Sequence, residues 1–321
     1  MSAIAIREQT DVSEARRSAV TLARRADLDE VQSGKVALAV TELATNVLRH
    51  GGGGEMVVEL SSIALEVFAL DRGPGMANVA ACLADGYSTA GSRGEGLGAV
   101  ARQADHFDIY SRPGQGVVAV ARFAVDGQGN DARWAGINVP YPGEAVSGDA
   151  WDARVDGEAT SLILADGLGH GLLAHEAAAA AIETFRRKGE APPARFLEIA
   201  HQAMRHTRGA ATSVVRLTGS GVSYAGVGNV SGTLLAAGAI KKMISHNGSL
   251  GHVARHFQSF EYPADAPYLV ILHSDGLGSN WSLDAYPGLS AADPALIAGI
   301  LYRDFRRGRD DVTVVAARPA P

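Results

Sequence analysis

Several features that mark whole classes of proteins are scarce in this sequence of 321 residues. It contains one cysteine, Cys82, so no disulfide can form within the chain, and this predicts a reducing compartment. Its first residues, MSAIAIREQTD, lack the basic start and the apolar run of a secretory signal peptide. No stretch reaches the ~18 consecutive apolar residues that would span a bilayer. These absences predict a cytoplasmic protein with no membrane partner.

Basic charge is also in short supply. The sequence has 29 lysine and arginine residues against 35 aspartate and glutamate residues, which gives a net charge of −6. Because nucleic-acid-binding proteins usually carry a basic surplus, this balance argues against a nucleic-acid partner. Apolar residues make up 46% and charged residues 20% of the chain, which is typical of a globular protein with about two domains. The polar stretch DGQGND, residues 126–131, predicts a linker between domains over residues 1–125 and 132–321.

The common phosphate-binding signatures are missing as well. A P-loop needs Gly-Lys followed by serine or threonine, whereas the only Gly-Lys pair is followed by Val36. A dinucleotide fingerprint would need glycine where Asn78 stands or, in a second candidate, where Ala99 stands, although alanine is sometimes accepted there. Neither candidate lies in a plausible βαβ unit. A nucleotide site in the first domain must therefore be built in another way.

Three other motifs are present in the first domain. One predicted helix carries Glu42 and Asn46, which are four residues apart and share a face. A strand predicted over residues 63–70 runs directly into Asp71, which is followed by RGPG, and the run Gly94–Gly98 opens a short predicted helix. Glycines before a helix expose backbone N–H groups to a phosphate. Each motif alone is weak, since most such helix faces are solvated stripes, but their combination in order is specific.

This combination resembles the Bergerat-fold (GHKL) ATPases, in which an E-x-x-x-N helix, a D-x-G-x-G loop, a lid and a G-x-G-x-G helix start follow in this order. The segment GYSTAGSRGEGLGAVARQADHFDIYSRPGQG is similar, more narrowly, to the small serine kinases of bacterial partner-switching systems. The resemblance implies an α/β-sandwich domain that binds ATP with Mg²⁺. It implies that Glu42 is the kinase general base, that Asn46 ligates the Mg²⁺ and that Asp71 accepts a hydrogen bond from the adenine amino group. The implied cofactor-binding residues are Asn46, Asp71, Gly73, Gly75, Gly94, Gly96, Leu97 and Gly98.

Aspartates stand at the ends of predicted strands in the second domain. Asp149 and Asp310 precede strand-like runs, and Asp166 and Asp275 end them. A single Asp-Gly pair is most often a turn, but this placement occurs four times. Four separated carboxylates at strand ends can converge on two divalent cations, and such oxygen ligands suit Mg²⁺ or Mn²⁺ rather than zinc. Two ions of this kind can bind a phosphate and activate a water molecule between them.

The motifs SGDAW, ADGLGHG, RGAATSVVRL, GVGNV, HSDGL and RDDVTVV resemble those of the metal-dependent PPM/PP2C phosphatases of the SpoIIE-like branch. The resemblance implies an α/β/β/α sandwich with the metals between its sheets. Eukaryotic-type members place a histidine directly after Asp-Gly as the leaving-group acid, but here that residue is Leu168, and we do not expect His170 to inherit the role. The choice of Asp310 over Asp311 as a ligand stays open. The implied metal ligands, which would activate the attacking water, are Asp149, Asp166, the carbonyl of Gly167, Asp275 and Asp310.

Together the two resemblances predict an α+β protein of two domains, a Bergerat-fold ATP-binding domain followed by a PP2C-like domain. The leading hypothesis is a metal-dependent protein serine/threonine phosphatase that acts on a phosphorylated STAS-type antagonist protein. Its ATP-binding domain would phosphorylate the same or a related protein. In one alternative the first domain senses ATP without transferring phosphate, and in another it is a binding module for a sigma factor or switch protein. The expected partners are STAS-domain antagonist or switch proteins, with a sigma factor or the stressosome as further candidates.

Overall fold

The computed structural model describes residues 2–83, 96–125 and 133–320. It divides into two compact units, of which unit 1 comprises residues 1–132 and 291–303 and unit 2 comprises residues 133–290 and 304–321. The expected linker lies outside the described residues. The division differs from the expected domains in one segment, since residues 291–303 group with the N-terminal part of the chain. None of the described helices has the length and apolar character needed to cross a membrane.

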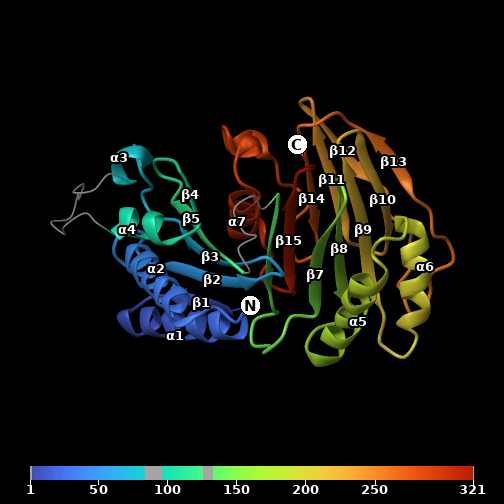
Figure 1. The fold of residues 1–321 in the computed structure, drawn as a ribbon, viewed down its shortest axis with the longest axis horizontal. Helices are drawn as coiled ribbons and strands as arrows, with labels where there is room; N and C mark the ends of the chain where they lie inside the picture. Colours follow the sequence, from blue (N-terminus) through green and yellow to red (C-terminus); the bar gives the residue numbers. More distant parts are fainter. Residues whose placement is uncertain (1, 84–95, 126–132, 321) are drawn as a thin grey trace. The chain divides into compact units, whose positions relative to one another are not determined.

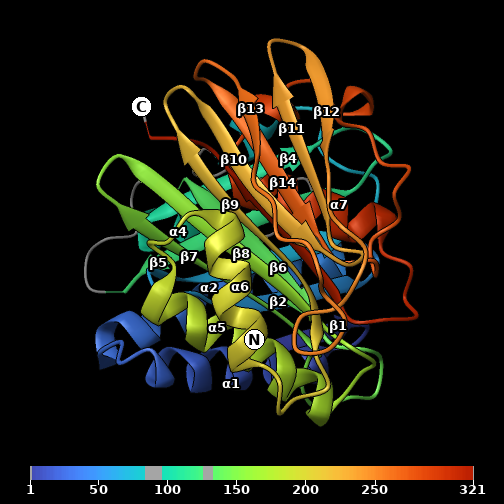
Figure 2. The same cartoon turned by 90° about the vertical axis from the view of Figure 1, so that its right-hand side faces the viewer.

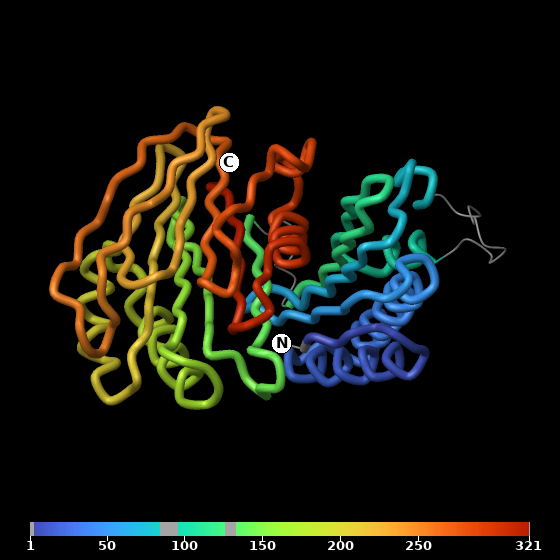
Figure 3. The backbone as a smooth tube through the Cα atoms, turned by 180° about the vertical axis from the view of Figure 1, so that it is seen from behind, coloured from blue at the N-terminus to red at the C-terminus, as the bar shows by residue number. Residues whose placement is uncertain are grey.

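Unit 1 contains an antiparallel sheet with the strand order β1-β2-β3-β5-β4. Helices α1 and α2 lie along one face of this sheet (Figure 3, dark blue helices beside the blue and cyan strands). The elements, in chain order, are β1 (Ser2–Ile6), α1 (Gln9–Arg25), α2 (Glu30–Arg49), β2 (Gly54–Leu60), β3 (Ala64–Asp71), α3 (Val79–Leu83), α4 (Gly96–Gln103), β4 (His106–Ser111), β5 (Val117–Ala124) and α7 (Pro294–Phe305).

The core of unit 1 follows from the alternation of side chains along its strands. Leu65 and Val67 of β3 point to the helical face, where they join Val36, Val40 and Leu43 of α2 in one apolar cluster. The three α2 residues recur at helical spacing, so one stripe of the helix is buried. Glu42 and Asn46 of α2 lie outside this stripe and are half-buried.

The opposite face of the same sheet is covered by α7. Every residue of α7 from Pro294 to Arg303 is buried, as expected for a helix that is apolar on all sides. A Cβ built on Gly299 would lie only 2.8 Å from Val118 Cγ1 and 3.5 Å from Phe68 Cδ1, so α7 approaches the strands closely at this glycine. Figure 1 draws α7 on the side of the strands away from α1 and α2. A helix from near the C-terminus therefore completes unit 1.

Buried charges hold the first turn of α7 to the sheet. Arg122 on β5, only 1% exposed, donates from Nε to Glu66 Oε1 at 2.8 Å and from Nη2 to Asp293 Oδ1 at 3.0 Å. Asp293 Oδ1 also accepts from the amide of Ala295 at 2.8 Å, and His106 Nε2 lies 3.2 Å from Asp293 Oδ2. Although burial opposes ionisation of Asp293, His106 and Arg122 lower its pKa to about 2. The charges of Arg122, Glu66 and Asp293 are paired within the cluster, which is the condition for burying charges at tolerable cost.

Unit 2 contains two antiparallel sheets with the strand orders β13-β10-β9-β8-β7 and β12-β11-β14-β15-β6. Helices α5 and α6 lie over the first of these sheets, in front of its strands in Figure 2. The elements are β6 (Trp134–Val139), β7 (Asp149–Asp156), β8 (Ala159–Gly167), α5 (Leu172–Lys188), α6 (Pro193–Ala203), β9 (Ala210–Thr218), β10 (Gly221–Val227), β11 (Ser231–Ala236), β12 (Ala239–Met243), β13 (Phe260–Pro263), β14 (Tyr268–His273), the short 3₁₀ helices η2 (Leu283–Ala285) and η3 (Leu289–Ala291), and β15 (Val312–Ala317).

Strand β8 is buried on both of its faces. Ile163 and Ala165 pack with Phe185 of α5 in the cluster beneath the helices. Leu162 and Leu164 alternate with them and are fully buried on the other face. Strand β7, the neighbour of β8, packs beside β6 and β15 of the second sheet. The two sheets therefore form a sandwich, and the ends of β8 and β15 are brought close together.

Candidate nucleotide and metal sites

The first and third motifs of unit 1 meet where α2 passes the start of α4. Glu42 and Asn46 lie one turn apart on α2, and α4 begins at Gly96. A Cβ built on Gly96 would lie 2.7 Å from Glu42 Oε2 and 3.9 Å from Asn46 Nδ2. The N-terminus of α4, with its partial positive charge, is therefore placed beside a carboxylate and an amide. Leu97 and Gly98 follow within α4, whereas Gly94 lies outside the described residues.

Asp71 ends β3 and is 6% exposed. Its Oδ1 accepts from the amide of Gly73 at 2.8 Å and from the amide of Val117 at 3.2 Å. Burial raises the pKa of Asp71, while these two hydrogen bonds and the charge of Arg303 oppose the rise. Because both hydrogen bonds fix the carboxylate through Oδ1, Oδ2 is the oxygen suited to accept from the amino group of a ligand.

The second motif is joined to the end of α2 through glycines. A Cβ on Gly51 would lie 2.6 Å from Asp71 Cβ, and one on Gly73 would lie 2.7 Å from the Cα of Gly51. Gly75 has φ +69°, and a Cβ there would lie 2.1 Å from the carbonyl oxygen of Arg112. Larger residues would separate the loop from the helix. The first motif is therefore part of α2. The start of α4 adjoins the middle of that helix at Glu42, and the loop after Asp71 adjoins its C-terminal end at Gly51.

Sequence reasoning missed Arg303, which holds the loop at Asp71 from α7. Its Nη1 donates to the carbonyl oxygen of Asp71 at 3.0 Å. In return, the guanidinium of Arg72 donates to the carbonyl oxygen of Arg303. The residues joined are 232 positions apart, so no local sequence signal pointed to this contact.

In unit 2 the strand pairings bring the predicted metal-site aspartates to corresponding strand ends. Asp149 on β7 lies directly opposite Asp166 on β8. Strands β14 and β15 are antiparallel neighbours, so Asp275, which follows β14, and Asp310, which precedes β15, lie at the same edge of the second sheet. Together with Asp311 these residues form what we call the aspartate cluster.

The electrostatics of the aspartate cluster show that its members share one environment. Burial raises the pKa of Asp166 to about 9, and the charge of each of the other four members adds to the rise. Burial likewise raises the pKa of Asp149 to about 7. Carboxylates that are buried together and repel one another gain from a divalent cation, which removes the repulsion. Their chemistry suits Mg²⁺ or Mn²⁺.

Asp310 and Asp311 have different surroundings in the structure. Asp311 is 2% exposed, and its Oδ1 accepts from the amide of Tyr141 at 2.8 Å. A Cβ on Gly148 would lie 2.7 Å from Asp311 Oδ2, so this carboxylate is packed against backbone. Asp310 is partly exposed, whereas Asp311 Oδ2 is buried without a hydrogen-bond partner, as is Asp149 Oδ2, so burial does not decide which of Asp310 and Asp311 is the ligand. Within residues 2–83, 96–125 and 133–320, no three acidic, histidine or cysteine side chains already surround one point as metal ligands, and the ligand assignment stays a prediction.

Several polar neighbours of the cluster were not assigned roles from sequence. The hydroxyls of Ser274 and Thr313 oppose the rise in the pKa of Asp149, and Ser274 Oγ accepts from the Thr313 amide at 2.9 Å. Asn229 Nδ2 donates to Asp275 Oδ2 at 2.5 Å. Asn229, Ser274 and Thr313 belong to the motifs GVGNV, HSDGL and RDDVTVV, respectively. Their membership of these motifs could have indicated that they lie beside the site.

Gly167, the predicted carbonyl ligand, closes β8 against α5. Its amide donates to the carbonyl oxygen of Gly148 at 3.0 Å, and a Cβ there would lie 2.1 Å from the carbonyl oxygen of Ala174.

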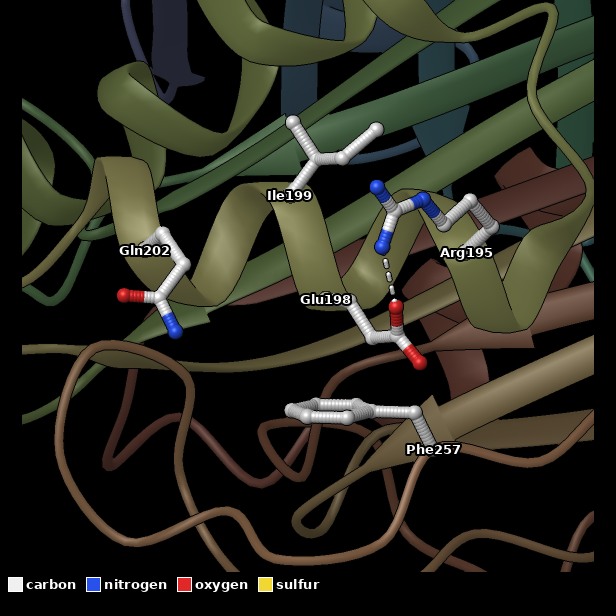
Figure 4. Close-up of a pocket in the computed structure, with 5 residues that line it drawn as sticks. All are labelled: Arg195, Glu198, Ile199, Gln202 and Phe257. Atoms are coloured by element: carbon white, nitrogen blue, oxygen red, sulfur yellow. Dashed lines mark hydrogen bonds and ion pairs between the residues drawn. The ribbon is translucent and has the colours of Figure 1, made fainter.

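A separate pocket is formed by α6 and the segment before β13, and no predicted site residue lines it (Figure 4). Its lining residues are Arg195, Glu198, Ile199, Gln202 and Phe257.

Comparisons with known proteins match the two parts of the chain separately. Residues 7–122 match the family of histidine kinase-like ATPase domains. The serine/threonine-protein kinase RsbT of Bacillus subtilis (strain 168) is 31% identical over 119 residues, which cover 36% of this chain and 90% of RsbT. The phosphoserine phosphatase RsbX of the same organism is 27% identical over 138 residues, which cover 42% of this chain and 69% of RsbX.

Solved structures resemble the C-terminal part. A chain from work on the bacterial stressosome as a modular system for secondary messenger signalling has a TM-score of 0.55 at 25% identity, covering 58% of this chain and 98% of that one. RsbX in complex with magnesium has a TM-score of 0.52 at 23% identity, covering 58% and 94%. The chain therefore belongs to the histidine kinase-like ATPase family through an RsbT-like N-terminal domain, and its C-terminal part has the PP2C-type phosphatase fold of RsbX.

Proposed function

We propose that this protein is a partner-switching regulator whose unit 2 is a metal-dependent protein serine/threonine phosphatase acting on a phosphorylated STAS-type antagonist protein. The aspartate cluster carries the proposal. Asp149 and Asp166 face each other across neighbouring strands, and burial with mutual repulsion raises the pKa of Asp166 to about 9. Buried carboxylates in this situation stay ionised at neutral pH when cations are bound between them. The similarity of the C-terminal part of the chain to the phosphatase RsbX supports the proposal.

Two Mg²⁺ or Mn²⁺ ions fit this donor set, and the magnesium complex of RsbX supports the choice. When bound, they supply an activated water and neutralise the phosphate. The chain itself orients the donors, since Asn138 Nδ2 donates to the carbonyl oxygen of Asp149 at 2.9 Å and Asn229 holds Asp275. The residues that we assign as ligands are Asp149, Asp166, the carbonyl of Gly167, Asp275 and Asp310.

Unit 1 would bind ATP with Mg²⁺ and phosphorylate a serine of the same or a related STAS-type protein. Glu42 is suited to take the serine proton and Asn46 to ligate Mg²⁺, because both lie beside the start of α4. Asp71 would bind adenine. Phosphoryl transfer needs mainly positioning and charge neutralisation, which these residues can supply. The similarity to the kinase RsbT supports the assignment.

Release of phosphate from a phosphorylated STAS-type protein in the presence of Mn²⁺ tests the phosphatase. We expect the full chain to release phosphate and Asp166→Asn to be inactive. Asp152→Asn is the matched control, because Asp152 lies on β7 but contacts Arg186 rather than the cluster. Absence of release by the wild-type chain, beside an active phosphatase, would contradict the proposal.

Transfer of label from ATP tests the kinase. The protein carries Asp275→Asn so that phosphate is not removed again, and we expect label on a serine of the STAS-type protein. Glu42→Gln should abolish the transfer without abolishing ATP binding. Tight ATP binding with no transfer to any STAS partner would contradict the kinase assignment.

One observation favours a second role for unit 1, as an ATP sensor that regulates the phosphatase. The end of α7 holds the Asp71 loop through Arg303, and the chain reaches Asp310 only seven residues later. Seven residues of chain therefore separate a residue that holds the nucleotide loop from a predicted metal ligand. In this role, ATP changes the rate of dephosphorylation in the Glu42→Gln variant as it does in the wild-type protein.

A further inference from the structure

His170 is held in a fixed position by contacts that the proposed metal site does not require. Its Nδ1 lies 2.7 Å from Glu144 Oε1. Its ring stacks on Tyr141, with the ring centroids 4.6 Å apart and the planes inclined by 15°. The amide of Glu144 donates to the carbonyl oxygen of Tyr141 at 3.0 Å, so a single turn presents both partners to the imidazole.

These contacts place His170 at the margin of the aspartate cluster. The amide of Tyr141, whose ring stacks on His170, donates to Asp311 Oδ1 at 2.8 Å. Burial raises the pKa of Asp310, and the charge of His170 is among the influences that oppose this rise. The side chain of His170 is 53% exposed and that of Glu144 is 33% exposed. The imidazole is therefore both near the site where phosphate would bind and open to a substrate from solvent.

The chemistry of the pair suits proton donation. A carboxylate bonded to Nδ1 fixes the orientation and the tautomer of an imidazole, as in other carboxylate–histidine pairs. The hydrogen bonding of this ring within the described residues uses Nδ1, so Nε2 is the atom suited to meet a substrate. An alkoxide is a poor leaving group, so hydrolysis at serine gains from a proton donor. The contact with Glu144 reverses the expectation from the sequence that His170 would not have this role.

We propose that Nε2 of His170 protonates the leaving serine oxygen, with Glu144 and Tyr141 as positioning residues; this rests on the proposed phosphatase function. Water attacks phosphorus, and the bond between phosphorus and the serine Oγ breaks. The electron pair stays on Oγ, which takes the Nε2 proton. The attacking water loses its own proton to solvent, and solvent then returns a proton to the imidazole. Serine and inorganic phosphate are the products.

Two substrates with different leaving groups test this assignment. The leaving group of a phosphoserine peptide is a strongly basic alkoxide. The leaving group of p-nitrophenyl phosphate is a weakly basic phenolate, which needs no proton. We expect His170→Gln to slow phosphoserine hydrolysis with Mn²⁺ by about 10²-fold, the usual contribution of a general acid, and to change p-nitrophenyl phosphate hydrolysis by less than about threefold. His206→Gln, at an exposed histidine after α6, is the matched control and should leave both rates unchanged.

Glu144→Ala should lower kcat for phosphoserine while KM stays near the wild-type value, and Glu144→Gln should retain more activity because it keeps an acceptor. A readout without metal is the ¹⁵N NMR spectrum of the His170 ring, in which the signature of a hydrogen bond from Nδ1 to Glu144 is expected in the wild-type protein and lost in Glu144→Ala. Equal losses on both substrates in His170→Gln would overturn the assignment. Absence of hydrolysis of either substrate by the wild-type protein would instead count against the phosphatase function itself.

Discussion

The guanidinium of Arg303 donates a 3.0 Å hydrogen bond from Nη1 to the carbonyl oxygen of Asp71. This contact joins the last turn of α7 to the loop that would bind adenine. Arg303 is buried, so the hydrogen bond is shielded from water. An ATP-binding domain that looks self-contained in sequence thus depends on a helix encoded 170 residues after its last strand.

Arg303→Gln should weaken ATP binding by about tenfold, because a charge-assisted hydrogen bond that orders the Asp71 loop contributes ~1.5 kcal/mol. Isothermal titration calorimetry with the full chain measures the change. Arg25→Gln, at an exposed arginine that ends α1, is the control. An unchanged affinity in Arg303→Gln would show that the loop is positioned without α7.

Gly96→Ala should abolish phosphoryl transfer from Mg²⁺-ATP while the protein still folds. The new Cβ would lie 2.7 Å from Glu42 Oε2, and the carboxylate can move aside because it is the far end of a flexible side chain. We expect loss of phosphoryl transfer with a nearly unchanged melting temperature. Gly34→Ala on α2 has open space around it and should instead raise stability by up to ~1 kcal/mol through helix propensity. Equal transfer by both variants would contradict the prediction.

Asp293→Asn should destabilise unit 1 and change its pH dependence. Removing one partner from a buried charge cluster typically costs about 3 kcal/mol. His106 and Arg122 outweigh burial and hold the pKa of Asp293 at about 2, below its ordinary 3.8, so its contribution of ~2 kcal/mol is present above pH 4 and lost as pH falls toward 2.

His106 adds the opposite dependence. Its pKa is raised, chiefly by hydrogen bonding to Asp293, so its contribution is complete below pH 6.5 and lost as pH rises through the raised value. Urea unfolding between pH 2 and pH 8 measures both effects, and the Asn variant should lose both. A wild-type profile with the same shape as the variant's would rule out this linkage.

Metal binding should change the stability of unit 2 in a direction set by Asp166. Burial and four neighbouring carboxylates raise its pKa to about 9, so in the metal-free protein stability falls as pH rises from about 4 to 9. Asp166→Asn should raise the melting temperature in EDTA at pH 8 and lose most of the stabilisation that Mn²⁺ gives to the wild-type protein. Differential scanning fluorimetry with and without Mn²⁺ measures this, and a lower melting temperature of the variant in EDTA would contradict it.

Elements with strong periodicity could be predicted from the sequence. The predicted helix that carries Glu42 and Asn46 is α2, and the predicted strand that precedes Asp275 is β14. The strands that escaped prediction, β1, β6, β12 and β13, lie at sheet edges. Edge strands are paired on one side only, and the side chains of β12 and β13 are largely exposed, so the sequences of these two strands carry a weaker pattern. The strand expected to end at Asp166 is one half of the β7–β8 hairpin.

The sequence by itself determined the ATP-binding motifs of the first domain, the aspartate motifs of the second, and the chemistry that each set predicts. These motifs can be recognised because the residues within each one are close together in the chain. Only the tertiary structure decided which groups meet across the chain. It seats α7 on the sheet of unit 1, it packs the carboxylate of Asp311 against the backbone while leaving Asp310 partly exposed, and it sets His170 against Glu144. These contacts join residues distant in sequence, and their free energy arises from burial and charge in the folded state, which no local pattern records.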